Sequence, residues 1–182
     1  MQMRKLRKST LIIWLLHWVS ALLILYLLAT SLTSGLGLTP RVSPTNWMNW
    51  HLSAGIVVLV TTMIRLSTSN PWKDLVCFSA IKKFEFGTIK SVLLLLVFAA
   101  SITGVTIFQK SPLGKTGIVF GVFPMPTFMR LNHSVHNVVI DIHIAMSCII
   151  FVFAVIHIYD GFRKAPVNGR SRIATMLWPW RN

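Results

Sequence analysis

Long apolar stretches separated by polar, basic connections dominate the pattern along this chain. Four of them, at residues 10–33, 47–67, 89–108 and 135–162, have no interior proline and few charged residues. At about 1.5 Å per residue, a helix over each stretch would cross a hydrocarbon core of about 30 Å. We therefore predict an all-α fold, an integral membrane four-helix bundle, and treat residues 1–182 as a single domain.

Composition supports a membrane protein and changes how the basic charge is interpreted. The chain is 54% hydrophobic and only 12% charged, which does not describe a soluble globular domain. The first stretch follows a basic segment, as in a secretory signal, but it is too long for a signal core and lacks a clear small-residue cleavage site. The formal net charge of +14 comes from residues next to the spans, where they suit anionic lipid headgroups. We expect a lipid bilayer as the surroundings and no nucleic acid partner.

The distribution of positive charge predicts the orientation. Arg4, Lys5, Arg7 and Lys8 precede the first span, whereas Arg41 alone lies between the first and second. Because cytoplasmic connections carry the excess of Lys and Arg, we expect both termini in the cytoplasm and, in a bacterium, a multi-pass inner membrane protein. The same side would hold Lys73, Lys82, Lys83 and Lys90 of the second connection and Arg163, Lys164, Arg170, Arg172 and Arg181 of the tail.

Histidines within the spans carry the chemical signal. His143 and His157 are fourteen residues apart, which is about 40° short of four helical turns, so they share one face about 21 Å apart. His17 lies near the inner end of the first span and His51 near the outer end of the second. Depth therefore pairs His17 with His157 on the inner side and His51 with His143 on the outer side.

Two imidazoles at each depth fit haem iron better than zinc. Zinc needs four ligands close together, whereas haem iron needs two axial ligands on opposite faces of a macrocycle. No C-x-x-C-H motif is present, so two non-covalent, bis-histidine b haems are predicted. A haem-free scaffold in which the histidines satisfy one another is the alternative. His133 and His136 are interpreted as surface histidines of the outer side, with His136 as a reserve ligand.

Few other side chains in the spans suggest chemistry. Arg65, fourteen residues after His51, lies near the inner haem level, where it can bind a haem propionate or simply extend to the membrane surface. The third span carries no histidine or acid and is expected to be structural. The acids lie near the membrane boundaries, so we expect no proton pump. Cys77 and Cys148 lie at different depths, so we expect no disulfide between them.

Several landmarks taken together resemble the prokaryotic cytochrome b561 family over nearly the whole chain. They are Leu16-His17-Trp18, the His51 to Arg65 spacing, Thr103-Gly104, the phrase FGVFPMP at 120–126 and the His143 to His157 spacing. The resemblance implies that His17 with His157, and His51 with His143, are the axial ligands. It also implies electron transfer between the quinone pool and a periplasmic donor or acceptor, and some members are proposed to oxidise superoxide while reducing ubiquinone.

This chain also departs from the family pattern. Lys90 and Ser101 stand where members commonly carry a histidine and a proline. If that histidine helps to bind quinone, the location of a quinone site here is open. A haem-bearing anchor subunit of a larger oxidoreductase, such as a hydrogenase or molybdenum enzyme, is the alternative function. The sequence does not decide whether the chain is an enzyme by itself, its redox partners, its reduction potentials or its oligomeric state.

Overall fold

The structure is a computed structural model that describes residues 2–35, 44–68, 86–108, 117–126, 128 and 131–163. Cys77 and most basic residues of the connections and of the tail lie outside the described residues. Two exceptions belong to helices: Lys90 is in the second turn of a spanning helix, not in the preceding connection as predicted, and Arg163 ends another helix.

Four long helices make up most of the described structure. They are α1 (Gln2–Gly35), α2 (Pro44–Thr68), α4 (Phe86–Phe108) and α5 (His133–Arg163). Each contains one of the predicted apolar stretches and is long and apolar enough to cross a membrane. The prediction of four helices that are long and apolar enough to span a membrane is confirmed. The helices extend past the apolar stretches because polar residues at their ends continue the backbone hydrogen bonding; Pro44, at the first position of α2, needs no such bond.

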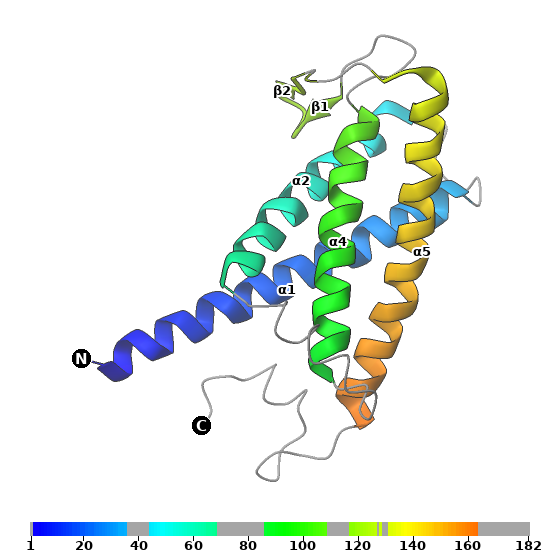
Figure 1. The fold of residues 1–182 in the computed structure, drawn as a ribbon. Coiled ribbons are helices and arrows are strands. Elements are labelled where there is room, and N and C mark those ends of the chain that lie inside the picture. Colours follow the sequence, from blue (N-terminus) through cyan, green and yellow to red (C-terminus); the bar gives the residue numbers. More distant parts are fainter. Residues whose placement is uncertain are drawn as a thin grey trace.

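The four helices alternate in direction, so α1 begins and α5 ends at the same end of the bundle (Figure 1). We call this the inner end and the opposite end the outer end. Helix α4 packs against both α2 and α5, and α1 crosses obliquely and packs against α2 (Figure 1). The first and last helices are not a main packing pair, and they approach each other at the inner end through His17 and His157.

The interior of the bundle is small, and many large apolar side chains point outward. Its buried centre consists of Val58, Val97, Ala100 and Ile150. A polar contact joins α1 and α2 in this interior: the Ser20 hydroxyl of α1 donates to Thr61 Oγ1 of α2 at 3.1 Å. Such hydroxyl pairs are typical of helix packing in lipid, where an apolar surface gains little by leaving the lipid tails.

A short hairpin at the outer end departs from the all-α prediction. Strands β1 (Ile118–Val119) and β2 (Phe123–Pro124) pair antiparallel, and both central turn residues, Phe120 and Gly121, have positive φ. Three residues, 120–122, connect the paired residues Val119 and Phe123, and the Val122 N–H closes the turn by donating to the Val119 carbonyl oxygen at 3.1 Å. The Phe120 N–H donates to the Ser53 hydroxyl of α2 at 2.8 Å, which attaches the hairpin to the bundle.

Candidate functional site

The structure brings His17 of α1 and His157 of α5 together at the inner end. Their ring centres are 6.5 Å apart, and the ring planes meet at 62°. An iron between two imidazoles, each bound through a nitrogen about 2 Å away, would hold the ring centres roughly 6 Å apart. The separation of these two rings is therefore close to the one that two axial ligands of a single haem require.

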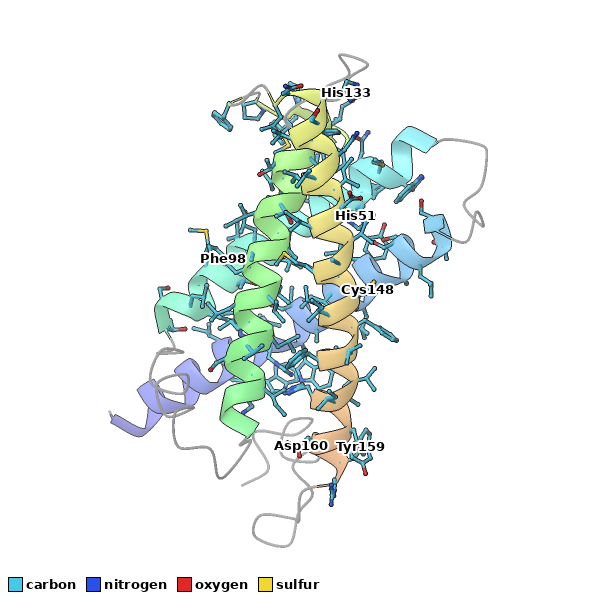
Figure 2. The ribbon with its side chains drawn as sticks, turned by 45° about the vertical axis from the view of Figure 1, so that its right-hand side comes forward. His51, Phe98, His133, Cys148, Tyr159 and Asp160 are labelled. Atoms are coloured by element: carbon cyan, nitrogen blue, oxygen red, sulfur yellow. The ribbon has the colours of Figure 1, made fainter. Side chains whose placement is uncertain are left out.

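His51 of α2 and His143 of α5 form the second pair toward the outer end. Both rings are half-buried and are close enough to interact electrostatically. Figure 2 shows His51 between the heights of His133, at the outer end of α5, and Cys148, near its middle. The two pairs predicted from depth thus occur at two separate levels of the bundle.

The hydrogen bonds of His143 define which ring nitrogen is available. Its Nδ1 lies 3.0 Å from the Ala100 carbonyl oxygen and 3.0 Å from Thr103 Oγ1, both on α4. A carbonyl oxygen can only accept, so Nδ1 must carry the proton. The other ring nitrogen, Nε2, then keeps its lone pair and can bind a metal. Ligating histidines typically donate from their second nitrogen in this way.

His51 is held in an equivalent manner by α1. Its Nδ1 lies 3.0 Å from Thr30 Oγ1, and the Thr30 hydroxyl donates to backbone carbonyls of its own helix, at 2.9 Å for Leu27. With its one proton used there, the threonine oxygen accepts from Nδ1–H of His51. The Nε2 atom of His51 is again left as the potential ligand.

Glycine at position 104 allows His143 to approach α4 closely. A Cβ atom built there would lie 3.0 Å from Cε1 of the His143 ring, closer than an ordinary van der Waals contact. Helix α4 therefore does more than pack, and its interpretation as a purely structural helix was incomplete. The Thr103-Gly104 pair is one of the landmarks in the sequence, but nothing in its spacing indicates a contact with His143.

Two features near the pairs favour a flat cofactor. Among the described residues, nothing lies within 4 Å of a Cβ built on Gly55, one turn from His51, or on Gly161, one turn from His157. Within the described ranges, no group of three or more His, Cys, Asp or Glu side chains could hold a metal ion. Each level therefore offers two nitrogen ligands with open space beside them, which suits haem iron, whose other four ligands belong to the macrocycle.

Arg65 lies at the inner level, where its spacing from His51 predicts it. Its side chain is half-buried and acts electrostatically on both His17 and His157. His133 is exposed, but His136 is only 8% exposed, and the prediction of a solvated surface role for it was wrong. The Nδ1 atom of His136 has no hydrogen-bond partner among the residues that the structure describes.

Helix α4 runs without a break through position 101. The Ser101 hydroxyl donates to the Val97 carbonyl oxygen, four residues earlier, at 2.8 Å. A proline at this position would remove the backbone N–H that reaches the same carbonyl and would bend the helix. The serine keeps α4 regular between its two levels.

Comparison with known proteins agrees with this arrangement. Residues 8–179 match the family model described as prokaryotic cytochrome b561. No curated protein and no solved structure matches the chain. Since the family match covers almost the whole sequence, including all four histidines of the two levels, this chain belongs to the prokaryotic cytochrome b561 family of membrane cytochromes, which implies haem-mediated electron transfer across the membrane.

Proposed function

We propose that this chain carries electrons across a bacterial inner membrane through two b haems, one held by His17 and His157 and the other by His51 and His143. The observation that supports this most strongly is the pairing itself. Four histidines from three helices meet two by two at separate levels, and the inner rings have a spacing close to that of axial ligands. Bound iron would also give the Nε2 atoms of His51 and His143 a partner inside the apolar bundle, where an unsatisfied nitrogen is costly.

In this proposal the protein binds and orients the cofactors. Bound haem supplies a one-electron iron couple inside an apolar bundle. Thr30, Thr103 and the Ala100 carbonyl hold the Nδ1–H groups of the outer histidines, which would leave each Nε2 available to bind haem iron. Helix rise separates the two levels by about 21 Å along α5, so together they form two stepping points across the membrane.

With both termini in the cytoplasm, the outer level faces the periplasm and the inner level faces the cytoplasm. The proposed electron donor or acceptor in the periplasm then meets the outer pair, and the quinone pool meets the inner one. If superoxide is the donor, two superoxide ions lose one electron each and become oxygen. One ubiquinone takes up these two electrons and two protons to become ubiquinol, so charge and atoms balance.

Haem analysis of detergent-purified protein tests the proposal. A pyridine haemochrome assay should give two haems b per chain in the wild type. His17→Ala and His157→Ala should each remove the inner haem alone, and His51→Ala and His143→Ala the outer haem alone. His133→Ala alters an exposed histidine of the same helix and should retain both. Wild-type protein without haem would refute the proposal, and a co-purifying catalytic subunit would favour the anchor-subunit alternative.

A further inference from the structure

A fourteen-residue step connects the two levels on three helices. The pairs, outer residue first, are His51 and Arg65 on α2, Gly104 and Lys90 on α4, and His143 and His157 on α5. Fourteen residues correspond to about 21 Å of helix rise and to almost four full turns. Each helix therefore presents one residue to the outer level and another to the inner level on nearly the same face.

The contact between α4 and α5 fixes where Lys90 lies. At the outer level, Gly104 meets the ring of His143. The two helices are antiparallel, so an equal step toward the inner end leads from Gly104 to Lys90 and from His143 to His157. Backbone register alone thus brings Lys90 to the depth of His157, and Lys90 acts electrostatically on both His157 and His17.

The two levels differ in charge. Arg65 and Lys90 are cations that act on both inner histidines, and one acid of opposite sign, Asp160, acts on His157. Figure 2 shows Asp160 near the inner end of α5. Among the described residues, two cations and one carboxylate thus act on the inner histidines, so positive charge predominates there.

Among the described residues, no fixed charge acts comparably on the outer pair. The electrostatic partner of His51 is His143, and that of His143 is the Ala100 carbonyl. Asp141 is close in sequence to His143, but it is exposed and lies about 200° around the helix from it. Within the described residues, the outer level therefore lacks the charged neighbours that the inner level has.

We propose that Lys90, together with Arg65, raises the reduction potential of the inner haem above that of the outer haem. Reduction adds an electron to the haem, so a nearby cation stabilises the reduced form. Electrons that enter at the outer level then collect at the inner level. This inference rests on the proposed function, because it requires a haem at each level.

Lys90 is the more informative of the two cations. Arg65 is half-buried and can also contact a haem propionate, so its loss would combine a charge effect with a binding effect. Lys90 is exposed at its helix surface, so its replacement changes the charge with little change in packing. A lysine side chain ordinarily keeps its charge at neutral pH.

A redox titration followed by haem absorbance tests the inference. Wild type should show two components, and His51→Ala should retain the one of higher potential, which identifies it as the inner haem. A unit charge about 10 Å from an iron, at an effective dielectric constant of about 20, changes the ratio of reduced to oxidised haem roughly tenfold. Lys90→Gln should therefore lower the inner component by about 59 mV, the value of a tenfold change for one electron.

Three further variants control the test. Lys90→Arg keeps the charge and should retain the wild-type potential. Asp160→Asn removes the opposing charge and should shift the inner component upward. Arg163→Gln removes an exposed cation six residues beyond His157 and should shift it much less than Lys90→Gln.

The outcomes separate the inference from the proposed function. With both haems retained, an unchanged inner potential in Lys90→Gln, equal shifts of both haems, or a lower inner than outer potential in wild type would each overturn the inference alone. Wild-type protein without haem would overturn the proposed function as well. If Lys90→Gln loses haem, Asp160→Asn becomes the deciding variant. An upward shift of its inner potential would support the inference, and an unchanged inner potential would count against the inference.

Discussion

The inner and outer levels of this bundle each hold a pair of histidines, but in different surroundings. At the outer level, hydroxyl and carbonyl oxygens from α1 and α4 hold the Nδ1 atoms of His51 and His143. At the inner level, His17 and His157 approach each other among charged side chains, with Arg65 and Lys90 both in electrostatic range. Hydrogen bonds orient the outer histidines, whereas nearby charged side chains set the inner pair apart from the outer pair.

The difference follows from position in the bundle. The outer histidines lie against the hydroxyls and the glycine of a neighbouring helix, where polar atoms must be satisfied within the protein. The inner pair lies near a membrane boundary, where long cationic side chains can keep their charge by reaching water or headgroups. In the proposed function, the same fold can therefore orient the ligands of one haem through hydrogen bonds and change the reduction potential of the other haem through charge.

The largest expected effect is a selective loss of the outer haem in Gly104→Leu. A side chain at this position would occupy the space of the His143 ring, since even a Cβ atom would lie 3.0 Å from Cε1. The inner haem should remain, because its ligands are about 21 Å away along α5. The haem-to-protein ratio and the number of redox components measure this effect.

Ala145→Leu is the matched control for added bulk. Ala145 is an exposed residue two positions from His143, so a larger side chain there should meet lipid and leave both haems bound. Loss of the inner haem together with the outer one in Gly104→Leu would show that the two levels are not independent.

A smaller effect is expected when the outer hydrogen bonds are removed. Thr30→Val and Thr103→Val keep the side-chain shape but lose the oxygen that lies 3.0 Å from His51 or His143. Loss of such a partner typically weakens metal binding 10–100-fold. Titration of haem into cofactor-depleted protein should show this loss at the outer level only, and more weakly for Thr103→Val because the Ala100 carbonyl remains.

Neighbouring threonines serve as controls for these two variants. Thr33 and Thr106 bond only to backbone carbonyls of their own helices in the described structure. Thr33→Val and Thr106→Val should therefore bind haem as the wild type does. An equal loss of affinity in these controls would mean that the effect comes from the helices and not from the ligand orientation.

The smallest effect is expected between the two levels. Thr61→Val removes the contact with Ser20 that joins α1 and α2, and such interhelical hydrogen bonds contribute about 1 kcal/mol. Both haems should remain bound, and the loss should appear as a lower thermal midpoint in detergent. Ser67→Ala, which removes an exposed hydroxyl bonded within α2, should leave the midpoint unchanged. A change at one haem only would show that this contact belongs to that level.

Much of the fold and the grouping of the site residues could be predicted from the sequence. Length and apolarity identify the four spans, because a bilayer of fixed thickness requires them. The His143 to His157 spacing predicts two levels, because a regular helix converts residue number into depth and angle. The hairpin was missed because two short strands give almost no periodic signal, and His136 was misjudged because burial at a helix end depends on what packs over it.

The sequence by itself determined the spans, the family and the depth of each histidine, since these depend on local composition and on the fixed rise of a helix. Only the tertiary structure decided that Thr30 and Thr103 hold the outer rings, that Gly104 contacts the His143 ring, and that Lys90 is within electrostatic range of the inner pair. These contacts depend on the rotation and tilt of each helix against its neighbours. Rotation and tilt result from packing between side chains far apart in the chain, which no single stretch of sequence specifies.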